Sequence, residues 1–251
     1  MALYTIARPF RLARIHRMAL ALSILSLAIP ILAIPSAAGA VEVRYEASLL
    51  SHYVWRGITL TNDNVFQPSV RLAHANGLSF EAWGNADLGD DNDTSGEINE
   101  TRLTLDYRKK LGAVEVGAGL TEYLFPNTPF HGSREFHLLA RLDTVVSPRL
   151  EVYYDVGEID GGYALIALAW EREFRRAWHV GAEISAGYAD AAFAIGRKAG
   201  LHDGNVEIRV TRSSRVFDIA LIGGWTGTFD EEVLPEQPVE FWSGLTVSFH
   251  L

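Results

Sequence analysis

Two kinds of side chain in this sequence could do chemistry: serines near histidines, and charged residues that alternate with apolar ones. A serine hydrolase needs a serine nucleophile within hydrogen-bond reach of a histidine base. Ser51 and His52 are adjacent, and adjacent residues on a strand point to opposite faces. Two further pairs lie two residues apart, Ser133 with His131 and Ser248 with His250. No G-x-S-x-G or zinc motif accompanies them and the chain has no cysteine, so we predict no catalytic residue, no metal site and no cofactor.

The charged residues follow a pattern that repeats along most of the chain. In the first repeat, Arg44 and Glu46 alternate with the apolar Val43, Tyr45 and Ala47. Strict alternation is typical of a strand with one polar and one apolar face. Because both signs of charge interleave on the polar faces, we expect these side chains to line a narrow polar lumen. The candidate lining residues are Arg44, Glu46, Arg56, Arg71, Glu81, Glu100, Arg102, Arg141, Glu183 and Arg209.

The final stretch, Phe241–Leu251, shows which kind of sheet these strands form. Phe241, Leu245, Val247 and Phe249 share one face, and the chain stops on an apolar residue. Such a row is typical of a transmembrane β-strand, whereas a bare apolar edge on a soluble sandwich would invite aggregation. The sequence therefore predicts an all-β, antiparallel transmembrane barrel rather than a soluble sandwich.

Twelve segments carry the pattern, an even number as a closed single-chain barrel requires. They are Val43–Leu49, Gln67–Ala73, Leu78–Leu88, Glu100–Tyr107, Val114–Leu120, Phe136–Leu142, Leu150–Val156, Tyr163–Trp170, Trp178–Ile184, Val206–Val210, Val216–Trp225 and Phe241–Leu251. Tyr163–Trp170 is apolar on both faces and Ala189–Gly200 is ambiguous, so ten or fourteen strands are also compatible.

Connections between the segments alternate between short and long, as periplasmic turns and outer loops do in outer-membrane barrels. The charged residues in and beside these connections separate in the same way, with basic residues on the short side and acidic residues on the long side. The short side carries Arg108, Lys109, Lys110, Arg149, Arg172, Arg175, Arg176, Arg212 and Arg215. The long side carries Asp63, Asp90, Asp91, Asp93, Asp160, Asp230, Glu231, Glu232 and Glu236. A wrong assignment of strands would mix these two groups.

Residues 1–40 have the features of a cleaved signal peptide. Four arginines precede the apolar stretch Met18–Leu32, and Ala38-Gly39-Ala40 is a small-residue cleavage site, leaving 41–251 as the barrel domain. No apolar run long enough for a membrane helix follows residue 40. The barrel domain has 18 basic and 31 acidic residues, a net charge of −13, which argues against nucleic acid as a partner.

Aromatic residues cluster near the predicted strand ends, where amphipathic rings favour the level of the lipid headgroups. We expect them to form girdles at the two interfaces: Tyr53, Trp55, Tyr107, Tyr123, Trp170, Trp178, Tyr188, Trp225 and Phe249.

One outer segment, Leu88–Ile98, resembles half of a calcium loop. Asp91-x-Asp93-x-Ser95-Gly96 matches its first six positions, but Arg102 replaces the glutamate needed at the twelfth. We therefore predict no calcium site there. The acids of this loop are either solvated or bridged through divalent cations to lipopolysaccharide.

Residues 45–90 carry a family resemblance. Ser51–Thr59 reads Ser-His-Tyr-Val-Trp-Arg-Gly-Ile-Thr, and Gln67 and Gly77–Asn85 follow it. Together these stretches resemble the TorF-type family of bacterial outer-membrane porins. The residues that match its motif are Tyr53, Trp55, Arg56, Gly57, Ile58 and Trp83. The resemblance implies a porin, transport across a Gram-negative outer membrane and an integral location there, without indicating a solute.

We therefore predict passive diffusion of small hydrophilic solutes and no enzyme activity. Twelve strands lie between the side-chain-filled barrels of about eight and the open channels of sixteen. A plugged structural or adhesion barrel is thus one alternative, and an outer-membrane lipid hydrolase is another. Arg56, beside Gly57, is the best single candidate for the solute pathway. Expected partners are outer-membrane lipid, lipopolysaccharide and, through the terminal strand, the barrel-assembly machinery.

Overall fold

The computed structural model describes residues 41–90 and 94–251. The predicted signal peptide, residues 1–40, lies outside the described residues, and so do residues 91–93 of the half calcium loop. No helix with the length and apolarity of a membrane span occurs in the part of the chain that the structure describes.

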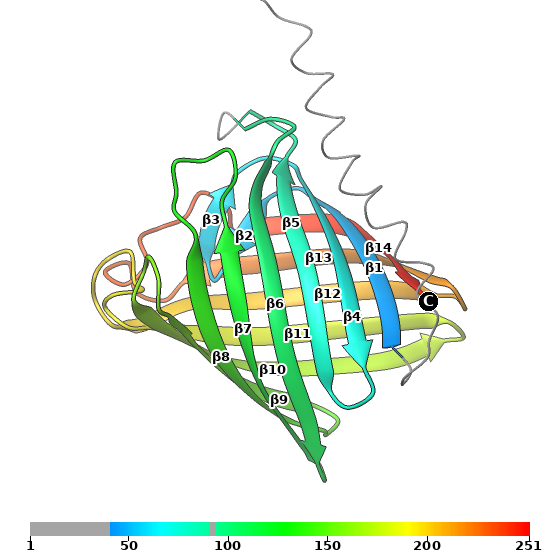
Figure 1. Ribbon diagram of the computed structural model, residues 1–251. Coiled ribbons are helices and arrows are strands. Elements are labelled where there is room, and N and C mark those ends of the chain that lie inside the picture. Colours follow the sequence, from blue (N-terminus) through cyan, green and yellow to red (C-terminus); the bar gives the residue numbers. More distant parts are fainter. Residues whose placement is uncertain (1–40, 91–93) are drawn as a thin grey trace, which may run out of the picture.

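Twelve antiparallel strands form a closed barrel, which confirms the predicted fold class and strand number (Figure 1). Consecutive strands of the barrel are neighbours in the wall, and β1 closes the ring against β14, with Arg44 opposite His250 and Leu50 opposite Gly244. The strands are β1 (Val41–Leu50), β4 (Val65–His74), β5 (Leu78–Asp87), β6 (Ile98–Leu111), β7 (Val114–Leu124), β8 (Ser133–Leu142), β9 (Ser147–Asp155), β10 (Gly161–Arg175), β11 (Trp178–Ala189), β12 (Gly200–Ser213), β13 (Phe217–Thr228) and β14 (Phe241–His250).

The alternating pattern produces a barrel that is apolar outside and polar inside. Leu138 and Leu221, on the outer face, are 62% and 64% exposed. Thr121 and Thr246, on the inner face, are buried. An exposed apolar face of this extent suits a hydrocarbon environment, since a soluble protein rarely exposes a continuous apolar surface.

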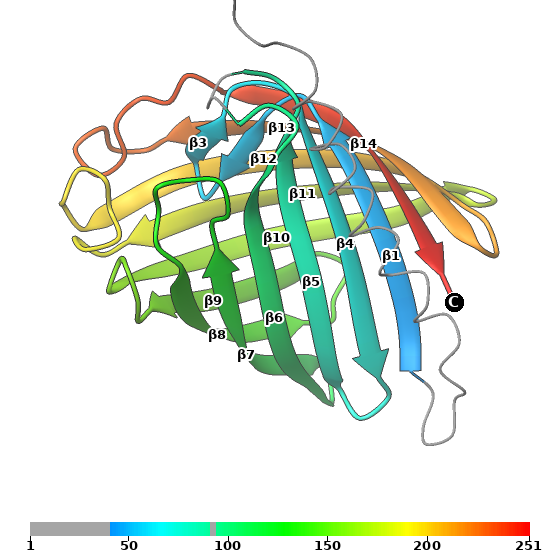
Figure 2. The ribbon, with the colours of Figure 1, turned by 45° about the horizontal axis from the view of Figure 1, so that its top comes forward.

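Short turns lie at the end of the barrel that also holds the start of β1 and the end of β14 (Figure 2). In the turn between β4 and β5, the Gly77 N–H donates to the His74 carbonyl, so Ala75 and Asn76 are the central residues, and Gly77 follows them in the left-handed region with φ of 99°. The longer connections lie at the opposite end, which we call the outer end.

One element is additional to the predicted strands. Between β1 and β4, the chain forms a small hairpin of β2 (Tyr53–Trp55) and β3 (Ile58–Thr61), which is separate from the wall. Arg56 and Gly57 at its tip have φ of 49° and 78°, as both central residues of a type I′ turn require. We call this hairpin, Tyr53–Thr61, the strap; Figures 1 and 2 show it inside the outer end of the barrel.

The strap corrects part of the predicted aromatic girdle. Tyr53 is only 6% exposed and Trp55 packs against the buried core of the lumen, so the prediction that they lie at the lipid interface is wrong. Tyr123 is also buried. Tyr107 and Tyr188, by contrast, are exposed, as a girdle requires.

Candidate functional site: the strap and the cavity beneath it

The strap crosses the lumen from one wall to another. It leaves the wall between β1 and β4, yet Arg56 at its tip bonds Glu135 on β8, four strands beyond β4 in the ring. A Cβ on Gly57 would lie 2.4 Å from the Asp203 Cβ on β12, three strands from β1 on the other side. The strap therefore obstructs the barrel across its width.

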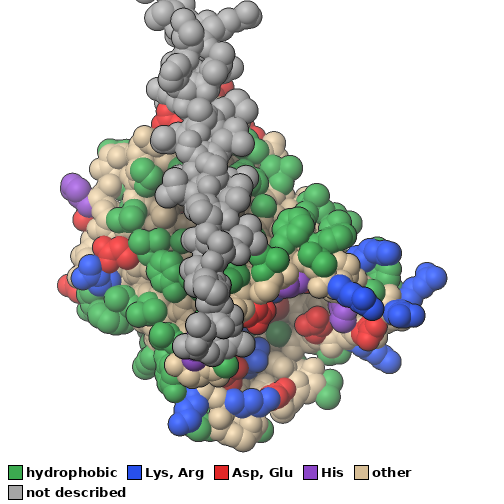
Figure 3. Space-filling model, turned by 45° about the vertical axis from the view of Figure 1, so that its right-hand side comes forward, with side chains coloured by type: hydrophobic (Ala, Val, Ile, Leu, Met, Phe, Trp, Pro, Cys, Tyr) green, Lys and Arg blue, Asp and Glu red, His purple; other side chains and the backbone are tan. Residues whose placement is uncertain are grey.

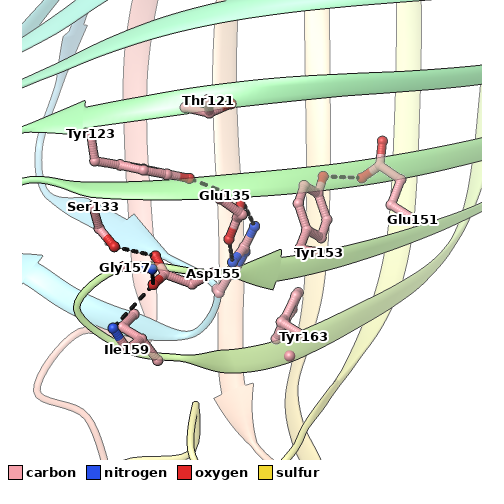
Figure 4. A network of polar contacts seen from close by, with 12 residues as sticks. Thr121, Tyr123, Ser133, Glu135, Glu151, Tyr153, Asp155, Gly157, Ile159 and Tyr163 are labelled. Atoms are coloured by element: carbon pink, nitrogen blue, oxygen red, sulfur yellow. Dashed lines mark hydrogen bonds and ion pairs between the residues drawn. The ribbon is translucent and has the colours of Figure 1, made fainter.

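Arg56 holds the tip of the strap in place. Its guanidinium donates two hydrogen bonds to the Glu135 carboxylate, Nη1 to Oε2 at 2.6 Å and Nη2 to Oε1 at 2.9 Å. The two side chains are only 9% and 3% exposed. Fork-to-fork pairing of this kind is strong and fixes the geometry of both groups. Glu135 also accepts a bond of 3.1 Å from the Tyr123 hydroxyl, and Figure 4 shows these two side chains directed toward each other.

Aromatic rings enclose the same guanidinium. Its Cζ lies 4.0 Å from the ring centroid of Tyr153, 4.6 Å from Trp55 and 4.7 Å from Tyr163. Cations over ring faces at these distances are stabilised electrostatically, more so where water is excluded. The cage and the carboxylate together compensate for the desolvation of a buried charge.

A second arginine holds the base of the strap. Arg102 Nε donates to Glu100 at 2.6 Å, and its guanidinium also bonds the Tyr53 hydroxyl. Tyr53 in turn donates to Glu100 at 3.1 Å. At the other end of the strap, Thr61 donates to the buried Asp87 at 2.8 Å. Both legs of the strap are thus bonded to the wall formed by β5 and β6.

Two outer loops cover the strap. Phe193 from the β11–β12 loop and Val233 from the β13–β14 loop are buried in the same apolar cluster as Tyr163. The ammonium of Lys198 bonds both Asp230, at 3.0 Å, and Glu232, which ties the two loops together. These bonds raise the pKa of Lys198, and Lys198 lowers the pKa of Asp230. The outer part of the lumen is therefore filled by packed chain.

Beneath Gly57 lies a buried polar cluster on the wall. Asp203 accepts bonds from Tyr163, at 2.9 Å, and from Asn205, at 2.7 Å, and its Oδ1 lies 2.9 Å from His202 Nδ1. This cluster leaves no room for a side chain at Gly57, since a Cβ would also approach Leu234 to 2.9 Å.

Gly57→Val is accordingly expected to displace the strap from β12. The substitution combines a left-handed φ with a clash, at a cost of about 2–3 kcal/mol of stability. The measurement is the urea midpoint, followed by heat-modifiable gel mobility of the refolded barrel. Gly96→Val is the matched control, because Gly96 has a similar φ of 75° and nothing within 4 Å of its Cβ position. Equal losses in the two variants would show that the close contact with Asp203 is unimportant.

A polar cavity of about 520 Å³ is bordered by the strap and the strand walls. Five of the ten predicted lining residues border it: Arg56, Arg71, Glu81, Arg102 and Glu183. The other five, Arg44, Glu46, Glu100, Arg141 and Arg209, lie outside its lining and take part in neighbouring ion pairs.

All ten predicted residues pair with a group of opposite charge. The pairs are Arg44–Glu46, Arg56–Glu135, Arg71–Glu81, Arg102–Glu100, Arg141–Glu115, Arg149–Glu183 and Arg209–Glu207. The arrangement holds the charged side chains against the wall and against one another. These side chains can both donate hydrogen bonds to a hydrated solute and accept hydrogen bonds from it.

Sequence-based reasoning missed the tyrosines and the aspartate that surround the strap. Tyr153 and Tyr163 border the cavity, and Asp203 lies under the strap tip. Tyr163 belongs to the segment that is apolar on both faces, so the sequence pattern does not indicate which face points inward. The register of β10 against β9 and β11 decides it, because Tyr163 is opposite Tyr153 and Ala189.

Residues 35–157 match a family model described as "Bacterial protein of unknown function (Gcw_chp)". Among curated proteins, none matches the sequence.

Solved structures give the clearest likeness. A KdgM porin superposes with a TM-score of 0.54 at 10% identity, covering 83% of this chain and 98% of the porin. The COG4313 outer membrane channel from Pseudomonas putida F1 gives 0.52 at 12% identity, covering 87% and 99%. A NanC porin gives 0.50 at 9% identity, covering 84% and 100%. The chain is therefore a twelve-stranded barrel with the fold of outer-membrane porins.

Proposed function

We propose that this protein is an outer-membrane porin in which small hydrophilic solutes diffuse passively through a lumen narrowed by the strap. The observation that carries the proposal is the cavity of about 520 Å³, with charged walls of both signs, inside a barrel whose outer face is apolar. A polar interior within an apolar exterior is the arrangement that lets water and hydrated solutes enter a membrane. The fold that the chain shares with porins supports the same function.

The proposal includes the location and the partners expected from the sequence. The chain is exported by a signal peptide that is cleaved after residue 40, and it inserts with its long loops outward, toward lipopolysaccharide. The barrel-assembly machinery engages β14, which carries the terminal apolar row. We also propose that the chain is of the TorF type, on the residues Tyr53–Ile58 and Trp83.

The paired charges have a consequence for selectivity. Each of the ten lining candidates has a partner of opposite sign, so the lumen presents little unbalanced charge to an ion. We therefore expect weak discrimination between cations and anions, and a preference set mainly by solute size.

Single-channel recording tests the proposal. The refolded protein is placed in a planar bilayer at neutral pH with symmetric salt, and stable conductance steps are expected. Arg56→Ala removes the bonds to Glu135 and loosens the strap, so its steps are expected to be larger and noisier. Arg134→Ala is the control, because Arg134 pairs with the exposed Glu122 and lies outside the cavity lining. Silence from a protein with heat-modifiable mobility would overturn the proposal.

A plugged barrel with a structural or adhesive role is the second candidate. The packing of Phe193 and Val233 around the strap favours it, because these residues fill the outer end of the lumen. The same recordings separate the two candidates, since a plugged barrel is folded but silent.

A further inference from the structure

The end of the barrel with the short turns carries several exposed arginines. Five exposed arginines lie in or beside the β10–β11 and β12–β13 turns, and we call them the basic rim: Arg172, Arg175, Arg176, Arg212 and Arg215. None of them makes an ion pair with any residue in 41–90 or 94–251. Figure 3 shows Lys and Arg side chains gathered at the right-hand edge of this face.

Two exposed cations at the outer end, by contrast, are paired with acids. Lys198 bonds Asp230 and Glu232, and Arg134 bonds Glu122 at 2.6 Å. Those charges are satisfied within the protein. The rim thus presents free guanidinium groups, which prefer planar, bidentate recognition of carboxylate or phosphate.

Two arginines of the rim extend the lipid-facing rows of their strands. On β10 the outward row runs through Leu168 and Trp170 to Arg172, and on β12 it runs through Ile208 and Val210 to Arg212. Both arginines therefore follow the apolar band on its outer surface, rather than facing the lumen. This position corresponds to the level of the lipid headgroups.

Aromatic rings lie between these two arginines. Trp178 on β11 is paired with Arg212, whose Cζ lies 5.5 Å from the indole centroid. Phe174, which is 57% exposed, contacts Trp178 with ring centroids 6.4 Å apart. Rings beside basic side chains are typical of a membrane interface, where the ring meets acyl chains and the cation meets phosphate.

We propose that the basic rim binds the phosphate groups of anionic phospholipids in the inner leaflet of the membrane. The side chains on the lipid-facing rows, Arg172 and Arg212, hold the phosphate, and Trp178 and Phe174 pack against the glycerol and upper acyl chains. Acidic cell-wall peptides are the competing ligand for these cations. The position of Arg172 and Arg212 beside the apolar band favours lipid, since a cell-wall polymer would approach the turn tips.

Native mass spectrometry of the mature protein, residues 41–251, in detergent tests this binding. Dioleoylphosphatidylglycerol and dioleoylphosphatidylcholine are added separately at equal concentrations, and the wild type is expected to retain the anionic lipid more strongly. Arg172→Gln with Arg212→Gln is expected to reduce that retention about tenfold, because each arginine near the surface contributes substantially to anionic-lipid binding. Arg134→Gln with Lys198→Gln, which removes the same charge from the outer end, is expected to behave as the wild type.

Two results would overturn the proposal. One is equal retention of phosphatidylglycerol by the rim variant and the wild type. The other is rim-dependent binding of soluble muropeptides in a protein that shows no preference for phosphatidylglycerol. Heat-modifiable mobility confirms that the double variant is folded, and Arg172→Gln alone serves if it is not. The test uses no conductance measurement, so its outcome is independent of the porin proposal.

Discussion

Glu135→Ala is expected to lower the stability of the folded barrel by about 3 kcal/mol, because removing one partner of a buried ion pair leaves the other charge uncompensated. The Arg56 guanidinium would keep its aromatic cage but lose both acceptor oxygens, and Tyr123 would lose its acceptor too. The measurement is a urea titration of the refolded protein, with the folded fraction read from heat-modifiable mobility.

Two further variants separate charge from packing. Glu135→Gln keeps an acceptor oxygen and is expected to lose less stability than Glu135→Ala. The double variant Arg56→Met with Glu135→Leu removes both charges and fills the space, so it is expected to recover most of the loss. If the double variant were as unstable as Glu135→Ala, the ion pair would not be what holds the strap.

Removing the strap is expected to raise single-channel conductance about threefold, since it clears the obstruction from a barrel wide enough to leave an interior space. The deletion is simple to build, because Leu50 and Val65 are opposite each other in the β1–β4 ladder. A short Gly-Ser turn can therefore replace the residues between them. The measurement is the conductance step of the folded variant in a planar bilayer.

The control for this deletion is a shortened β7–β8 loop, residues 126–131, which is mostly exposed at the outer end. We expect that variant to conduct as the wild type does. An unchanged step in the folded strap deletion would show that another element limits the flow. Candidates for that element are the loops that carry Phe193 and Val233.

The wall of the barrel was predictable because a membrane barrel imposes the same rule on every strand. Lipid on one side and polar lumen on the other force alternation, and alternation is visible in residues such as those of β1 and β14. The alternation of short and long connections then indicated at which end of the barrel each strand begins. Twelve strands could be counted even though the segment Tyr163–Trp170 of β10 is apolar on both faces, because its length is that of a single strand.

The strap was not predictable from the same rule. Neither of its faces meets lipid, so its residues need no polar–apolar alternation, and its two strands are only three and four residues long. Trp55 and Tyr53 were assigned to the interface because rings are enriched there. The ring of Trp55 instead covers the guanidinium of Arg56. Sequence alone identified the right segment, whereas the partners on β8 and β12 depend on barrel geometry.

The position of the strap near the start of the barrel domain has a consequence for biogenesis. The strap is synthesised between the first two barrel strands, but its partners Glu135, Asp203 and Leu234 are synthesised much later. The ring closes only when β14 meets β1. A barrel that closed with the strap still outside its mouth would have a wider lumen and an external loop open to proteolysis. Because Phe193 and Val233 pack in the cluster that Trp55 contacts, correct assembly requires the strap to enter the lumen before these two outer loops close over it.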